Sequence, residues 1–178
     1  MDPFDFALLV LRLWLGVVMI THGINHGRDL AGTASWFAAK GFRQPRLNAV
    51  ASAAAEIAVG VGLVVGLATP LAAAGLVATM VVAFGAIHRF AGFFVFARPD
   101  EGYEYVATLA VAALTLGILG PGGISMDAAV GLADILDGWT GLAIGVGGAV
   151  AGIVQLLLLW RPPGVESAHT SSEQEVPA

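Results

Sequence analysis

Five long apolar segments, separated by polar stretches, run along this chain. They cover about residues 4–22, 49–67, 70–88, 103–119 and 139–160. Each is roughly 17–22 residues long, and a helix of that length crosses the hydrocarbon core of a bilayer, which is about 30 Å thick. The pattern therefore predicts an all-α, polytopic membrane protein with five transmembrane helices.

Residues that start and stop helices mark the ends of these segments. Pro70 occupies a first-turn position of the third segment, and Gly120-Pro121 follows the fourth. Trp139 and Trp160 bracket the fifth segment, where aromatic side chains anchor a helix at the two membrane surfaces. These signals agree with the boundaries drawn from the apolar runs.

The composition places the chain outside the class of soluble domains. Hydrophobic residues make up 57% of it and charged residues 12%, with a mean hydropathy of +0.83, whereas a soluble domain has about 25% charged residues. The chain has no cysteine, which excludes disulfides, thiolate metal sites and thiol redox relays within it. We expect the lipid bilayer to surround it and no nucleic acid to bind it.

The basic residues outside the apolar segments all fall on one side of the membrane if the chain crosses it five times. They follow the first, third and fifth segments: Arg28, Lys40, Arg43, Arg46, Arg89, Arg98 and Arg161. The connections on the other side carry acidic residues and neither Lys nor Arg. By the positive-inside rule the basic side is cytoplasmic, so the N-terminus is predicted outside and the C-terminus inside.

The connection GTASWFAAKGFRQP, between the first two segments, is too short and polar to cross the membrane. Trp36 and Lys40 favour a short helix lying in the cytoplasmic interface, and an ordinary surface loop with a helical turn is the alternative. Together with Arg43 and Arg46, they form a basic face that suits the docking of a soluble partner protein.

Two charged residues, Arg12 and Glu56, lie inside apolar segments. Such residues normally face the interior of a helix bundle and have a partner. Their positions within the two segments put their Cα atoms at depths that differ by about one helical turn, which an arginine side chain can span. We therefore predict an Arg12–Glu56 ion pair, which serves either as a functional site or as a purely structural clamp. Small residues near Glu56, among them Ala53 and Gly60, favour close helix packing on the same face.

Further polar residues gather at the predicted cytoplasmic ends of the segments. Glu104 begins a stripe with Thr108 and Thr115 on the fourth segment, and Tyr103 and Tyr105 flank it. His88 ends the third segment and His22 the first. These residues, with Arg12 and Glu56, are predicted to line a polar cavity open to the cytoplasm. For Glu104 and the two tyrosines, an interfacial girdle is the alternative.

The stretch THGINHG, with His22 and His26 four residues apart, has the spacing of two metal ligands on a helix. Gly23 and Gly27, however, are typical of a helix C-terminus, which places His26 at or beyond the end of the helix. We therefore predict no metal site, with His22 in the polar cluster and His26 in solvent.

The motifs LLVLRLWLGVVMITHGINHG, GTASWFAAKGF, AEIAVGVGLVVGLATPLAA and GYEYVATLAVAALTLGILGPGGISMD together resemble the DoxX family of small bacterial membrane proteins. The resemblance covers about residues 4–127 and implies a four-helix transmembrane core over residues 1–127. Residues 128–163 then add an external loop and a peripheral fifth helix, and residues 164–178 form a disordered cytoplasmic tail. The resemblance also implies location in the bacterial inner membrane.

The resemblance implies two kinds of function. Relatives resemble the membrane subunit of a thiosulfate:quinone oxidoreductase, and others are linked with oxidative stress and thiol homeostasis. The chain is accordingly expected to be a membrane anchor or accessory subunit that docks soluble redox or stress-response proteins, with a homo-oligomer as a further option. The alternative is binding or transport of a quinone, lipid or small anion in the polar cavity. Because no self-contained catalytic motif is present, the chain is at most the membrane subunit of a quinone-linked oxidoreductase.

Overall fold

The computed structural model describes residues 2–96 and 101–162, and these are almost entirely helical. The long helices are α1 (Pro3–Arg28), α3 (Pro45–Val65), α4 (Thr69–Ala86), α5 (Glu104–Leu119) and α8 (Gly138–Leu159). The short ones are α2 (Leu30–Ala39), η1 (His88–Phe90), α6 (Met126–Ala129) and α7 (Ala133–Leu136). The all-α prediction is confirmed, since no strand occurs among the described residues. The predicted tail at 164–178 lies outside them.

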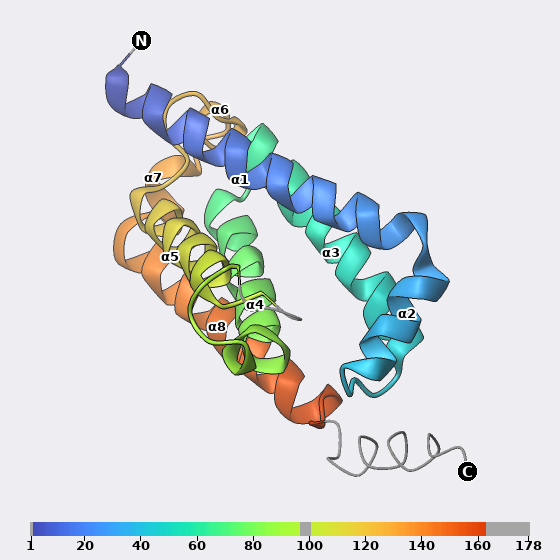
Figure 1. The fold of residues 1–178 in the computed structure, drawn as a ribbon. Coiled ribbons are helices and arrows are strands. Elements are labelled where there is room, and N and C mark those ends of the chain that lie inside the picture. The colour runs from blue at the N-terminus through green and yellow to red at the C-terminus, as the bar shows by residue number, and fades with distance from the viewer. Residues whose placement is uncertain (1, 97–100, 163–178) are drawn as a thin grey trace, which may run out of the picture.

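Within the described residues, four helices are long and apolar enough to cross a membrane, namely α1, α3, α4 and α8, and α5 is a shorter apolar helix. The chain is thus a multi-pass membrane protein. Figure 1 shows α1 lying along α3, with α4, α5 and α8 forming a second group. Helix α4 also packs on α3 and so joins the two groups. The buried core between them contains Leu15, Met19, Leu76 and Leu116.

Helices α1 and α3 approach closely through small residues. A Cβ atom added to Gly60 would lie 2.6 Å from the carbonyl oxygen of Gly16, and one added to Gly23 would lie 2.9 Å from that of Ala53. Such contacts let two membrane helices pack backbone against backbone. The prediction that Ala53 and Gly60 face a helix interface is confirmed. Gly23 is a packing residue in the middle of this interface, and the expectation that it ends the first helix is wrong.

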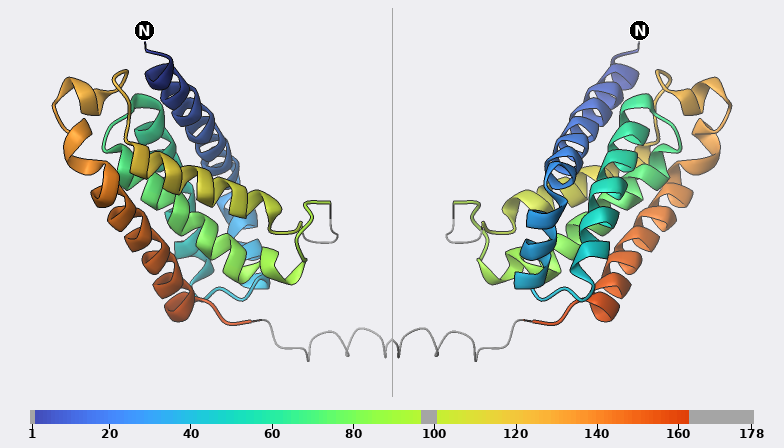
Figure 2. Two further views of the ribbon diagram at one scale, coloured as in Figure 1. Left: turned by 90° about the vertical axis from the view of Figure 1, so that its left-hand side faces the viewer. Right: turned by 90° about the vertical axis from the view of Figure 1, so that its right-hand side faces the viewer.

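Helix α8 packs on α4 and α5 through its own small residues. Gly148 and Gly152 lie against the carbonyl groups of Ala74 and Ala78 on α4, and Gly141 lies against that of Gly117 on α5. The opposite face of α8 is exposed. The end of α8 and the α2–α3 connection lie at one end of the bundle, and α6 and α7 lie at the other, near the N-terminus (Figure 2).

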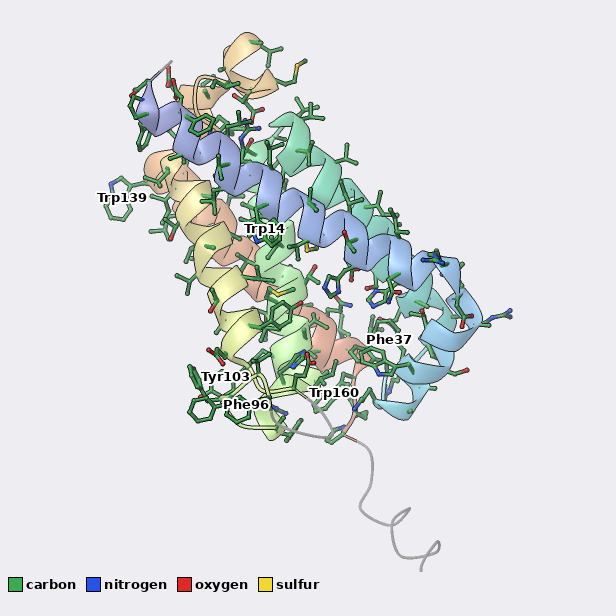
Figure 3. All side chains as sticks on the ribbon, turned by 45° about the horizontal axis from the view of Figure 1, so that its top comes forward. Trp14, Phe37, Phe96, Tyr103, Trp139 and Trp160 are labelled. Carbon is green, nitrogen blue, oxygen red and sulfur yellow. The ribbon has the colours of Figure 1, made fainter. Side chains whose placement is uncertain are left out.

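The two tryptophans that bracket the fifth apolar segment differ in their surroundings. Trp139 is 86% exposed, as an interface anchor would be, but Trp160 is only 9% exposed. The indole Nε1 of Trp160 donates a hydrogen bond to the Lys40 carbonyl oxygen at 2.8 Å, and its ring belongs to a cluster with Phe37 and Phe42 (Figure 3). Trp160 therefore fastens the end of α8 to the α2–α3 connection, and its place at a membrane surface stays a prediction.

A helix does form in the connection between α1 and α3. Asp29 caps α2 by accepting a hydrogen bond from the Gly32 amide at 2.8 Å, which is a standard way to satisfy the free amides of a first turn. The short helix is thus confirmed over the alternative of a loop, and its position relative to a membrane surface stays a prediction.

Candidate functional site

A cavity of about 460 Å³ lies between the first five helices. Its wall combines aromatic, apolar and ionisable side chains from α1 to α5: His22, His26, Trp36, Glu56, Thr79, Met80, Ala83, Ile87, His88, Glu101 and Tyr105. Four of the residues predicted to form a polar cluster meet here, namely His22, Glu56, His88 and Tyr105. The structure places these four residues around one cavity, together with His26, Trp36 and Glu101.

The buried centre of this site is a contact between His26 on α1 and Glu56 on α3. The imidazole Nδ1 lies 3.1 Å from Glu56 Oε2. Ser52, one turn before Glu56, donates its hydroxyl proton to Glu56 Oε1 at 2.6 Å, and the same hydroxyl oxygen is 3.3 Å from His26 Nδ1. The prediction that His26 is solvated is wrong, because α1 continues through Gly23 and Gly27 to Arg28. The continued helix carries His26 onto the face that packs against α3.

A second wall is made of three stacked or edge-on rings. The rings of His22 and Tyr105 stack at a centroid distance of 6.4 Å with an interplanar angle of 18°, and His88 meets Tyr105 edge-on at 6.1 Å. His88 is held in turn by a 2.6 Å hydrogen bond between its Nδ1 and the Glu101 carbonyl oxygen. The Tyr105 hydroxyl has no hydrogen-bond partner among the described residues, so it is available to a ligand.

The hydrogen bonds determine what the imidazoles can offer. A carbonyl oxygen only accepts, so His88 Nδ1 carries the proton, and in the neutral ring Nε2 is left as an acceptor. His26 Nδ1 lies near both the Glu56 carboxylate and the Ser52 hydroxyl, and these neighbours do not fix which ring nitrogen carries the proton. The cavity therefore offers imidazole acceptors, the Glu56 carboxylate and the Tyr105 hydroxyl donor within one largely apolar wall.

Arg12 does not belong to this site, and the predicted Arg12–Glu56 ion pair is wrong. Gly16 of α1 faces Gly60 of α3, so Arg12, one turn before Gly16, lies opposite the end of α3. Glu56 lies one turn before Gly60. The two residues are thus two turns apart along the interface, or about 12 Å at 1.5 Å per residue. The prediction failed because α1 runs further and α3 begins earlier than the apolar runs indicated, which changes the register of the pair.

The fully buried Arg12 binds backbone carbonyls instead of a carboxylate. Its Nη1 donates to the carbonyl of Leu63 at 3.2 Å, and its Nη2 donates to that of Ile124 in the loop after α5. Leu63 is in the last turn of α3, where free carbonyls and the helix dipole favour a cation. Arg12 therefore joins α1, the end of α3 and the loop before α6, and we call this set of contacts the Arg12 clamp.

Asp127 completes this clamp on the next helix. Its two carboxylate oxygens accept hydrogen bonds from the amides of Ala68 at 2.7 Å and Thr69 at 2.8 Å, at the first turn of α4. The Asp127 amide donates to the carbonyl of Gly66 at 2.8 Å. The side chain is buried, and its charge suits a helix N-terminus. Arg12 and Asp127 together fix the α3–α4 turn to the loop that follows α5.

Glu104 and Tyr103 also lie outside the cavity. Glu104 borders a shallow pocket with Phe93 and Thr108 on another face of α5, where its Oε2 accepts a hydrogen bond from the Val95 amide at 3.2 Å. Tyr103 packs edge-on against Phe84 and Phe93. The predicted stripe of Glu104, Thr108 and Thr115 thus does not reach the cavity, and Tyr105 is the only member of the GYEY segment that does.

The residues predicted to form a docking face lie in α2, in the α2–α3 connection and in the first turn of α3. Trp36 lines the cavity, and its ring meets Phe37 edge-on. Arg43 and Arg46 are exposed in and after the α2–α3 connection. Across residues 2–96 and 101–162, no group of three or more His, Asp or Glu side chains has an arrangement that could hold a metal ion.

A comparison with protein families matches residues 7–89 to the model described as DoxX. The matched region runs from the first turns of α1 to η1 and contains His22, His26, Trp36, Glu56 and His88. It ends before α5, so the similarity in the GYEY segment lies outside it. No curated protein and no solved structure matches the chain.

Proposed function

Because this chain belongs to the DoxX family over residues 7–89, we propose that it is a membrane subunit whose cavity binds the head group of a quinone or quinol. The observation that carries this proposal is the joint lining of one cavity by His26–Glu56 and by the His22–Tyr105 ring pair. Such a group, when bound, supplies two-electron redox chemistry, which fits an accessory subunit of a redox complex.

The chemistry of the cavity fits a flat, uncharged head group. Its volume of about 460 Å³ falls in the range of about 300–1,000 Å³ for small-molecule sites, which are mostly apolar with a few oriented polar groups. The Tyr105 hydroxyl can donate to a quinone carbonyl, and Glu56 or an imidazole can accept from a quinol hydroxyl. A small anion fits less well, because Glu56 contributes negative charge and Arg12 is elsewhere.

We further propose that the chain crosses a bacterial inner membrane five times, with its N-terminus outside. Two observations support the crossing by α5. The Arg89 guanidinium, just after α4, lies 5.4 Å from the Trp160 ring at the end of α8, so α4 and α8 end on the same side. Helix α5 leads from that side back to α6 and α7 (Figure 2). Its 16 residues extend about 24 Å at 1.5 Å per residue.

In this proposal, a soluble partner protein exchanges electrons with the bound quinone or quinol, and it docks on the basic side of the chain. Arg43 and Arg46 are exposed there, and Trp36, beside the α2–α3 connection, lines the cavity. A protein bound at this connection would therefore reach the head-group site. Loss of this partner from native pull-downs of an Arg43→Glu, Arg46→Glu variant, with the cavity intact, would support this arrangement.

The binding test compares two tyrosines that are neighbours in sequence. Tyr105→Phe removes a hydroxyl from the cavity but keeps the ring on His22, and Tyr103→Phe makes the same chemical change outside the cavity. We expect Tyr105→Phe to weaken binding of a short-chain ubiquinone about two- to tenfold, the value of one hydrogen bond. Tyr103→Phe should bind as the wild type does. Binding is measured by quenching of tryptophan fluorescence, since Trp36 lines the cavity.

Glu56→Gln provides an independent check, because it leaves the volume of the cavity unchanged while it removes the charge beside His26. It should alter the relative affinity for quinol and quinone, since an amide accepts less strongly than a carboxylate. Equal affinities in the wild type, Tyr105→Phe and Glu56→Gln would rule out the cavity as the quinone site.

A further inference from the structure

A second cavity, separate from the quinone site, lies in the groove between α4 and α8. It has a volume of about 530 Å³, and its apolar wall includes Phe84 on α4 and Ile153 and Leu157 on α8. Arg89 and Arg161 lie at its end. Both flanking helices are candidate membrane spans, so a molecule in the groove would extend along hydrocarbon and end among these two basic side chains.

The two arginines are held in place by the protein itself. The Arg89 guanidinium lies over the rings of Phe90, at 4.6 Å, and Trp160, at 5.4 Å. The Nη1 of Arg161 donates to the carbonyls of Leu157 at 2.9 Å and Trp160 at 2.7 Å. A guanidinium has five N–H donors, so most donors of both side chains remain for a ligand.

The charge at this end of the groove is uncompensated within the described part of the chain. Among residues 2–96 and 101–162, no acidic side chain lines the groove, and neither Arg89 nor Arg161 forms an ion pair with any of these residues. Arginine binds phosphate through two parallel hydrogen bonds, and basic pockets between membrane helices bind anionic head groups. The lining also lacks a carboxylate that would receive the ammonium group of a zwitterionic lipid.

We propose that this groove binds an anionic glycerophospholipid. Its phosphate lies at Arg89 and Arg161, and an acyl chain lies along the groove between α4 and α8. The apolar wall and the paired guanidinium groups together select a lipid over free phosphate, because only a lipid fills both parts of the site. The lipid would join α8 to the region that matches the family, which ends at Arg89.

Native mass spectrometry of the detergent-solubilised full chain tests this proposal. We expect the wild type to bind phosphatidylglycerol about tenfold more tightly than phosphatidylcholine, because the choline ammonium of phosphatidylcholine would lie near two guanidinium groups, and like charges placed close together cost binding free energy. The variant Arg89→Gln, Arg161→Gln should lose this preference. The control Arg43→Gln, Arg46→Gln removes the same charge from the α2–α3 connection and should keep it. Free glycerol 3-phosphate should not compete.

Four results would overturn the proposal. Equal binding of the two lipids by the wild type would do so, as would the same loss of preference in the control variant, which would indicate a general charge effect. Competition by glycerol 3-phosphate at the concentration of the lipid would indicate a phosphate site. These wild-type readouts remain decisive if the Arg89, Arg161 variant fails to fold. A variant with Glu166, Glu173 and Glu175 changed to Gln should bind lipid unchanged, and about tenfold tighter binding would instead assign the groove to the chain's own tail.

Discussion

His26 Nδ1 and Glu56 Oε2 lie 3.1 Å apart across the interface of α1 and α3. This contact joins the end of α1 to the middle of α3 and forms part of the cavity wall. If His26 were removed, the buried Glu56 carboxylate would be left without a partner, and the uncompensated buried charge would destabilise the fold. The pair is thus at once a packing contact and a source of polarity for the proposed head-group site.

A double-mutant cycle tests the pair. His26→Gln and Glu56→Gln should each lower the free energy of unfolding. The double variant should lower it by less than the sum of the two single effects, with a coupling energy of about 0.5–3 kcal/mol. The cycle of Arg12→Ala and Glu56→Gln should be additive, because those residues are two turns apart. Thermal unfolding in detergent, followed by circular dichroism, measures both cycles. Coupling in the Arg12 cycle and none in the His26 cycle would contradict the register of α1 on α3.

The positions of the helices could be predicted from the sequence, but their register could not. Runs of apolar residues are long because the bilayer is thick, so helices form at all five predicted segments. Polar residues continue the helix beyond the hydrocarbon, and hydropathy does not show where it ends. The few added residues at the end of α1 and the start of α3 were enough to assign Glu56 the wrong partner.

The sequence also could not show which groups Arg12 and His26 contact. Arg12 binds carbonyl groups of Leu63 and Ile124, and every residue has a carbonyl, so no sequence pattern marks them. The spacing of His26 from His22 marked it as a candidate site residue. Its place in the fold, however, depended on the role of Gly23, which the sequence left open. Glycine both ends helices and permits close packing of membrane helices, and only the neighbouring helix decides which applies.

The clamp at the α3–α4 turn should be sensitive to the separation of the donors on residue 12. Arg12→Lys keeps the charge but has a single ammonium group, which cannot reproduce the two separate guanidinium contacts to Leu63 and Ile124. We expect it to destabilise the protein by about 1–3 kcal/mol, the cost of one buried unsatisfied polar group. Wild-type thermal stability in Arg12→Lys would show that charge alone suffices.

Asp127 should show a graded response in the same assay. Asp127→Asn keeps one oxygen acceptor for the amides of Ala68 and Thr69, whereas Asp127→Ala keeps none. The loss of an N-cap costs about 0.5–2 kcal/mol, so the alanine variant should unfold at a lower temperature than the asparagine variant. Equal effects would mean that the charge of Asp127 matters and its hydrogen bonds do not.

Two glycines on one helix provide a matched test of the α1–α3 packing. A Cβ atom at Gly23 would lie 2.9 Å from the Ala53 carbonyl oxygen, whereas one at Gly27 would lie 3.8 Å from the Ala53 Cβ. Gly23→Ala should therefore destabilise the protein by about 1–3 kcal/mol through overpacking. Gly27→Ala should be neutral or stabilise it by up to about 1 kcal/mol, because alanine is the better helix former. If both variants behave alike in thermal unfolding, the close approach of the two backbones is wrong.

The last prediction concerns the number of crossings and uses the absence of cysteine from the wild-type chain. Single cysteines at Ser35 in α2, at Phe96 before α5, and at Asp134 in α7 occupy exposed positions. In spheroplasts, a membrane-impermeant maleimide should label Asp134→Cys at once, and the other two variants only after permeabilisation. The comparison of Phe96→Cys with Asp134→Cys is decisive, because α5 is the one long helix between these two positions. They can lie on opposite sides of the membrane only if α5 crosses it. The same labelling pattern at both positions, whether before or only after permeabilisation, would mean that α5 does not cross, and the chain would then have four spans.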